Sequence, residues 1–371
     1  MPDNGKIEPA QFRKLVMFFI LGRAILITPT FLAEQAKQDA WISAAAGLLF
    51  GVLIVLLLRK MGTRFPESTL PQYSQGILGR WAGSAVAFLF FLHALLLCSL
   101  TTRSLSVFMA STMMPETPIQ WIIGLYLFIA AVGARKGIEN IGKTADVFYP
   151  LVVALFIIFV VFVTPQIEAE KLQPVLAKGM APVLSGAYQV AGFPYMNLVL
   201  LLPIFPFVSD SRQAAKSFLQ GTLLGGGSLC ILTLLCVAVL GGPETANELF
   251  PTYEMAKTIE IGMFVQRVEA IMALMWFITI YFQVVICFYV AITILAQIFR
   301  LTDYRPLVFP MAFLLTAFAQ LIAPSISYLI DFSRSTWSSY TLTYGLLILV
   351  LLALAAVRRG SGRRSGEASP S

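Results

Sequence analysis

A long apolar stretch, from Leu184 to Val208, is interrupted near its middle by Gly192, Phe193 and Pro194. The stretch is long enough to cross the hydrocarbon core of a membrane, which takes about 20 helical residues. Proline lacks an N–H and disfavours helix at the preceding residue, while glycine adopts backbone angles that other residues resist. The interruption therefore frees backbone polar groups at membrane depth, where they are tolerated only if buried in protein or lining a cavity. We predict a binding site at residues 192–195; a proline kink without a ligand is the alternative.

Composition places the whole chain in a membrane. Of its 371 residues 58% are hydrophobic and 12% are charged, with a mean hydropathy of +0.82, which is typical of a polytopic membrane protein. We predict one all-α transmembrane domain over residues 1–357, followed by a basic, disordered tail over 358–371. Ten segments are candidate spans: 12–33, 40–59, 82–109, 118–134, 143–164, 182–208, 213–239, 264–298, 306–323 and 337–357.

Several kinds of chemistry find no support in the sequence. The four cysteines and the single histidine, His93, all fall inside apolar spans, so neither a disulfide nor a zinc signature is expected. The chain has no G-x-x-x-x-G-K-[ST] loop for a nucleotide, and no nucleophile–base pair stands out. We therefore expect no enzyme activity, no metal and no cofactor.

The net charge of +7 follows a topological pattern. With ten alternating spans and a cytoplasmic N-terminus, eighteen Lys and Arg residues fall on the cytoplasmic side and six on the outside, while Arg23 and Arg103 lie within spans. This excess is the positive-inside pattern, so we expect both termini in the cytoplasm and no nucleic-acid partner. The basic tail is expected to contact anionic lipid headgroups.

The first span is also interrupted, by Gly22, Arg23 and Ala24, with Pro29 further along. An arginine at mid-bilayer is costly unless it is paired or hydrated, so we expect Arg23 to face the protein interior or water. Because the broken spans are the first and the sixth, the sequence predicts two five-helix repeats of inverted topology, about 12–164 and 182–357, each opening with a broken helix.

The middles of four spans fall at a similar depth. Half-helix N-termini at this depth attract a carboxylate and unwound carbonyls attract an ammonium group, so a small zwitterion would suit the site. The candidate ligand-binding residues are Gly22, Arg23, Ala24 and Ile25 in the first span, Leu97 in the third, Gly192, Phe193, Pro194 and Tyr195 in the sixth, and Tyr281 in the eighth.

Two further features have competing interpretations. Glu139, Lys143 and Asp146 share one helical face; they form an exposed ion-pair cluster, or Lys143 places its charge where cation-coupled relatives hold an ion. The outside loop from Gly241 to Gly262 either docks a partner through Phe250 and Tyr253 or forms a gate over the site.

Several short motifs, in this order and spacing, resemble the B subunits of bacterial spore nutrient-germinant receptors, a spore permease family within the amino acid–polyamine–organocation superfamily. The resemblance runs from about Ile7 to Val357, although Arg23 stands where superfamily relatives carry small residues. It implies a ten-helix inverted-repeat fold, a site for an amino acid or similar nutrient, and A and C subunit partners in the spore inner membrane. The motifs are Gln38-Asp39-Ala40-Trp41, Gly137-Ile138-Glu139, Gly192-Phe193-Pro194, Phe250-Pro251-Thr252-Tyr253-Glu254, and Arg267 with Glu269.

Two functions remain open at this point. The first is a receptor subunit, in which nutrient binding shifts a conformational equilibrium that partner subunits read. The second is a cation-coupled secondary amino acid permease, since one fold hosts different functions. The midplane spans lack a clear Asp or Glu for sodium, which favours the receptor.

Overall fold

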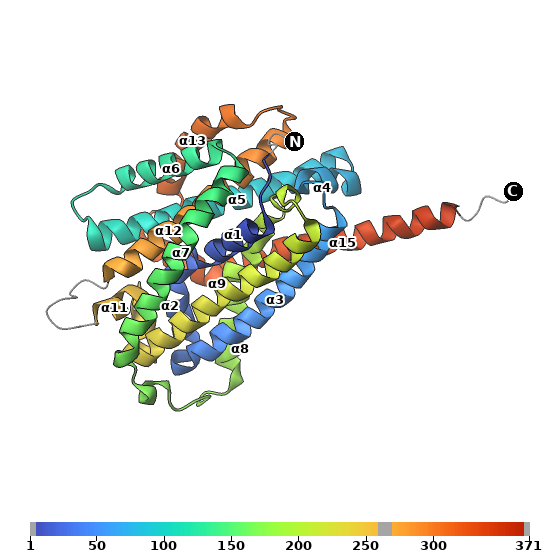
Figure 1. Ribbon diagram of the computed structural model, residues 1–371. Coiled ribbons are helices and arrows are strands. Elements are labelled where there is room, and N and C mark those ends of the chain that lie inside the picture. The colour runs from blue at the N-terminus through green and yellow to red at the C-terminus, as the bar shows by residue number, and fades with distance from the viewer. Residues whose placement is uncertain (1–4, 259–268, 367–371) are drawn as a thin grey trace.

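The computed structural model describes residues 5–258 and 269–366, with side chains described as far as Ala356. Within these residues the chain is a bundle of helices, as predicted, joined by short turns (Figure 1). The longer helices are α1 (Pro9–Leu21), α2 (Ala24–Ala36), α3 (Ala40–Arg64), α4 (Leu70–Leu78), α5 (Arg80–Phe108), α6 (Ile119–Arg135), α7 (Ile138–Val163), α8 (Met180–Val190), α9 (Ser211–Leu240), α12 (Glu269–Ile298), α13 (Val308–Leu321) and α15 (Trp337–Gly366); the short ones are α10 (Gly242–Asn247), α11 (Pro251–Lys257) and α14 (Ile326–Asp331).

The apolar helices match the predicted spans. Among the described residues, six helical stretches are long and apolar enough to cross a membrane, and α6 and α13 are shorter apolar helices. α12 is the most deeply buried of the six and packs against α5, α6, α7 and α1. The first and sixth predicted spans are each divided in two.

The first span breaks where the sequence predicts. α1 ends at Leu21, and Gly22 adopts φ 6° and ψ −121°, which is not a helical conformation. α2 then begins at Ala24, and Pro29 lies inside it. The glycine allows the backbone turn, so the break has a local cause.

The sixth span breaks at the predicted residues as well. α8 ends at Val190 and a wide helical turn (Ala191–Tyr195) follows, in which Phe193 is extended at φ −138° and ψ 113°. The Phe193–Pro194 peptide bond is cis. A 3-10 helix, Met196–Leu201, continues the chain, so the α-helix does not resume in this span.

Close helix packing surrounds these breaks. α1 lies along α9, and a Cβ at Gly221 would stand 2.5 Å from the carbonyl oxygen of Arg13. A Cβ at Gly225 would likewise press on Ile20. The α9 glycines therefore let two helices approach closely.

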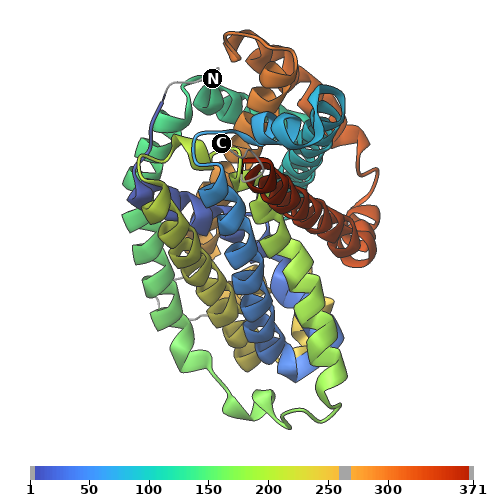
Figure 2. The ribbon, with the colours of Figure 1, turned by 90° about the vertical axis from the view of Figure 1, so that its right-hand side faces the viewer.

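Both ends of the described chain lie at one end of the bundle. The Ile7 N–H donates to the Phe207 carbonyl at 2.9 Å, and the Arg64 guanidinium donates to the Ala355 carbonyl at 2.7 Å. Gly62, at the end of α3, packs on Phe205, so these two contacts are neighbours. In Figure 2 the connection between α7 and α8 lies at the opposite, lower end. α15 extends to Gly366, so helix continues into the stretch predicted as a disordered tail; residues 367–371 lie outside the described residues.

Candidate functional site

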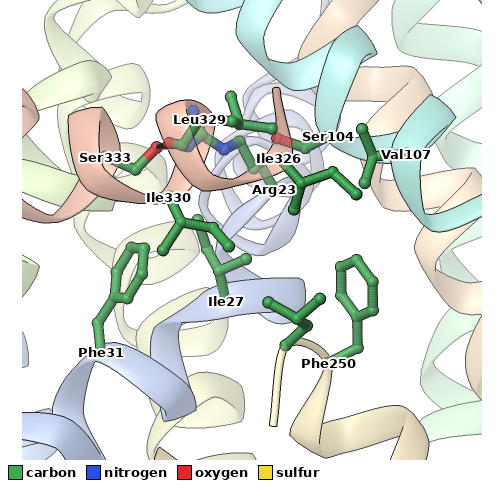
Figure 3. A pocket seen from close by; sticks show the side chains of 11 residues that line it. Arg23, Ile27, Phe31, Ser104, Val107, Phe250, Ile326, Leu329, Ile330 and Ser333 are labelled. Atoms are coloured by element: carbon green, nitrogen blue, oxygen red, sulfur yellow. Dashed lines mark hydrogen bonds between the residues drawn. The ribbon is translucent and has the colours of Figure 1, made fainter. Parts of the chain in front are cut away.

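Arg23 follows the first break and lies against Phe193 of the second; Figure 3 shows it among the residues that line a pocket. Its side chain is only 1% exposed, which confirms that it faces the protein interior. The guanidinium donates to the Ser333 hydroxyl and lies over the Phe193 ring, 5.2 Å from the ring centroid. Its Nε and Nη1 have no hydrogen-bond partner among the described residues. The first and second halves of the chain therefore meet at this side chain.

Gln283 of α12 fixes the backbone of the first break. Its Oε1 accepts a hydrogen bond of 2.7 Å from the Arg23 backbone N–H and one of 3.4 Å from the Thr101 hydroxyl of α5. A Cβ at Gly22 would overlap this amide, with 2.6 Å to its Cδ. Glycine at position 22 thus provides both the turn and the space for Gln283.

A small cavity of about 30 Å³ adjoins Arg23, with room for about two water molecules. It lies between α2, α5, the segment before α11, and α14 with the turn that follows it (Figure 3). Arg23 is the charged side chain in its lining, and two serines are the other polar ones. The described lining residues are Arg23, Ile27, Phe31, Ser104, Val107, Leu249, Phe250, Ile326, Leu329, Ile330 and Ser333.

α15 satisfies the carbonyl groups that the second break frees. The Ser338 hydroxyl donates to the Gln189 carbonyl at 2.8 Å, and the Thr341 hydroxyl donates to the Gly192 carbonyl at 2.9 Å. A Cβ at Gly192 would stand 2.5 Å from the Cα of Ser338. α15 therefore supplies the hydroxyl groups that satisfy the backbone at the second break.

The segment around α11 points inward. Phe250 and Tyr253 lie edge-on to Phe108 of α5, with ring centroids 5.1 and 5.4 Å away, and Tyr253 is buried. The Thr252 hydroxyl donates to the Ile25 carbonyl at 3.2 Å, so α11 is tied to the start of α2. These contacts with the chain's own α5 and α2 favour the gate of the two alternatives, while partner docking through Phe250 and Tyr253 stays a prediction. Residues 259–262 of this loop, and Arg267, lie outside the described residues.

Lys143 does not lie near the breaks. Its amine pairs with Glu139 at 2.7 Å on an exposed face, whereas Asp146 pairs with Lys14. The adjacent Gly142 packs against Gln11, which is eleven residues before Gly22, or about 16 Å along α1. This position favours the exposed ion pair of the two interpretations, and the role of Lys143 as a cation substitute stays a prediction.

The remaining candidates divide between the break and the core. Ala24 and Ile25 are buried at the start of α2, beside Arg23. Leu97 is buried in α5 outside the cavity lining. Tyr195 fills the space beside Gly51 and Gly226 on α3 and α9, and the Tyr281 hydroxyl lies against Gly133 of α6. The structure thus brings Gly22, Arg23 and Phe193 together, but it turns both tyrosines away from them.

Five polar residues at the site were missing from the predicted set. An amide in the middle of a long apolar span was a usable signal for Gln283. The serines and threonine carry no such signal, because hydroxyls are common in spans, where they bond to their own helix carbonyls. The five are Ser104, Gln283, Ser333, Ser338 and Thr341.

Comparisons with known proteins agree with this architecture. A family profile described as "Spore germination protein" matches residues 6–326. Spore germination protein KB of Bacillus subtilis (strain 168) is 24% identical over 369 residues, covering 98% of each chain. Spore germination protein YndE of the same organism is 23% identical over 299 residues, covering 80% of this chain and 82% of that one.

Solved transporters share the fold. Mhp1, a nucleobase-cation-symport-1 family transporter in a closed conformation with bromovinylhydantoin bound, matches with a TM-score of 0.67 at 13% identity, over 89% of this chain and 77% of that one. A Na+-coupled sialic acid symporter matches with a TM-score of 0.67 at 9% identity, over 90% and 76%. The predicted ten-helix, five-plus-five inverted-repeat fold with broken first and sixth helices is thereby confirmed.

Proposed function

Because this chain belongs to the spore germination protein family, we propose that it is the B-type subunit of a nutrient-germinant receptor. In this proposal it binds a small nutrient, with an amino acid as the expected class, at the midplane of the spore inner membrane. It then signals germination through A and C subunits. Both chain termini lie in the cytoplasm, as the distribution of Lys and Arg favours.

One observation carries the proposal: the two broken spans meet at a single buried side chain with unused hydrogen-bond donors. Arg23 follows the first break and lies over Phe193 of the second. Broken helices at the bilayer midplane are where proteins of this architecture place small-molecule sites. A ligand at Arg23 would contact both repeats at once, and so would influence their relative orientation.

The segment from Leu249 to Tyr253 gives this site an outer gate. Leu249 and Phe250 line the cavity, while Thr252 is bonded to the first turn of α2. A cavity of about 30 Å³ is too small for an amino acid, so entry requires this segment to move. A nutrient with different affinities for the open and closed positions would shift their equilibrium, which is what a receptor needs.

The test uses a substitution at the first break and a matched control. Gly22→Ala places a methyl group on Gln283, whereas Gly124→Ala on α6 meets nothing within 4 Å. Spores carrying Gly22→Ala should need a much higher nutrient concentration to germinate, at normal abundance of the protein in the membrane. Gly124→Ala spores should respond as wild type. A normal nutrient response in Gly22→Ala spores would place the site elsewhere.

A cation-coupled permease is the second candidate, and the likeness to solved symporters favours it. The two functions differ in what the isolated chain does. Proteoliposomes containing only this chain should bind the nutrient without accumulating it if the chain is a receptor subunit. Uptake driven by a sodium or proton gradient would instead establish the permease.

A further inference from the structure

Arg23 is a buried cation without a counter-charge among the described residues. Ion pairs in this part of the chain use other cations, namely Lys14, Lys143, Lys171, Lys257 and Arg334. The guanidinium has one hydroxyl partner, Ser333, and one aromatic partner, Phe193. A charge withdrawn from water is stabilised by an opposite charge or by a full set of hydrogen bonds, and Arg23 has neither.

The residues that line the neighbouring cavity suit an anionic ligand. The described lining residues include no Asp or Glu, and Arg23 is accompanied by the hydroxyls of Ser104 and Ser333 and otherwise by apolar side chains. α2, a helix of 13 residues, begins immediately after Arg23 and adds the partial positive charge of its N-terminus. The electrostatics of the cavity therefore favour an anion, while an ammonium group would find no carboxylate to pair with.

We propose that Arg23 makes this site selective for a small carboxylate with an apolar body. The carboxylate supplies the missing counter-charge and accepts from the guanidinium N–H groups that have no partner. The apolar body packs against Ile27, Phe31 and Phe250. An α-amino group is not required for binding. The inference rests on the proposed function, because it names the ligand class for the same site.

The experiment measures thermal unfolding of the purified, detergent-solubilised chain with matched probe pairs. The pairs are propionate with propionamide, isobutyrate with isobutyramide, and L-alanine with L-alaninamide, tested with uncharged nucleosides and sugars as a reference set. We expect at least one carboxylate to raise the melting temperature and its amide to act at least about tenfold more weakly, since one charge-assisted pair is lost. Propionate or isobutyrate should act at least as strongly as L-alanine.

Arg23→Gln tests the residue itself. This variant should lose the response to carboxylates, and its melting temperature without probe should be equal to or above that of wild type, because an unpaired buried charge is removed. Arg103→Gln is the control: Arg103 is another intramembrane arginine with an unpartnered Nε, and it lies outside the cavity lining. It should keep the carboxylate response.

Three results would overturn the proposal: equal protection by an amide, a carboxylate response that survives Arg23→Gln, or protection only by probes that carry no carboxylate. In each of these cases the chain still binds a small molecule, so the proposed receptor function stands. Absence of protection by every probe, the nucleosides and sugars included, would count against both.

Discussion

The substitution Gly192→Ala should both destabilise the protein and abolish its nutrient response. The new Cβ would stand 2.5 Å from the Cα and Cβ of Ser338, and a backbone atom cannot rotate away. α15 must therefore shift relative to the break. The shift would strain the hydrogen bonds from Ser338 to the Gln189 carbonyl and from Thr341 to the Gly192 carbonyl.

The size of this effect follows from two contributions. Overpacking by one methyl group in a close-packed site costs about 1–3 kcal/mol. Losing one of the two hydrogen bonds adds about 0.5–1.5 kcal/mol. We therefore expect Gly192→Ala to lower stability by about 1.5–4.5 kcal/mol, and a leucine at this position to be worse.

The assay is thermal unfolding of the purified chain, followed by nutrient-induced germination of spores that carry the variant. Gly227→Ala on α9 is the matched control, because its Cβ would meet nothing within 4 Å. It should be neutral, or more stable by up to about 1 kcal/mol, since alanine is the better helix former. Equal melting temperatures for Gly192→Ala and wild type would refute the packing argument, and normal germination would refute the role of the break.

Three further changes test other parts of the protein. Gln283→Leu leaves the Arg23 backbone N–H without its acceptor and should cost about 1–3 kcal/mol of stability, measured by thermal unfolding. Phe250→Ala should weaken nutrient affinity while leaving recovery of the A subunit unchanged in co-purification; the opposite result would favour the docking surface over the gate. Asp210 caps α9, and the backbone N–H groups of Gln213 and Arg212 hold its carboxyl pKa below the ordinary value. The Asp210 carboxylate therefore stabilises the fold above its unfolded-state pKa, and this stabilisation is lost as the pH falls through the folded-state pKa. In Asp210→Asn, the free energy of unfolding should consequently fall less as the pH is lowered.

Sequence reasoning located the breaks because their causes are local. Gly22 and the Gly192–Pro194 pair act on their own backbone, and the cost of an intramembrane charge places Arg23 inside whatever the tertiary fold is. The partners of these residues were not predictable in the same way. Gln283 lies 260 residues from Arg23 and Ser338 lies 149 from Gln189, so only the folded chain pairs them.

The two assignments that had competing interpretations share a physical reason. Aromatic residues flanked by charges, such as Phe250 and Tyr253, give the same sequence pattern whether their rings contact a partner or the rest of their own chain. The helical spacing of Lys143 fixes its face but not its depth relative to the break. Burial and depth depend on tertiary packing, and single-sequence patterns do not contain them.

The hydroxyl contacts from α15 have a consequence for how relatives of this protein can be recombined. The family profile ends at residue 326, yet Ser338 and Thr341, which bond to the carbonyls at the second break, lie beyond it. A chimera that joins residues 1–326 to the last helix of a relative would keep every residue of both breaks. It would still reshape the second break unless the donor helix carries hydroxyls in the same register. The same exchange would replace Ser333, the hydroxyl partner of Arg23, so the last part of the chain shapes both the second break and the cavity lining.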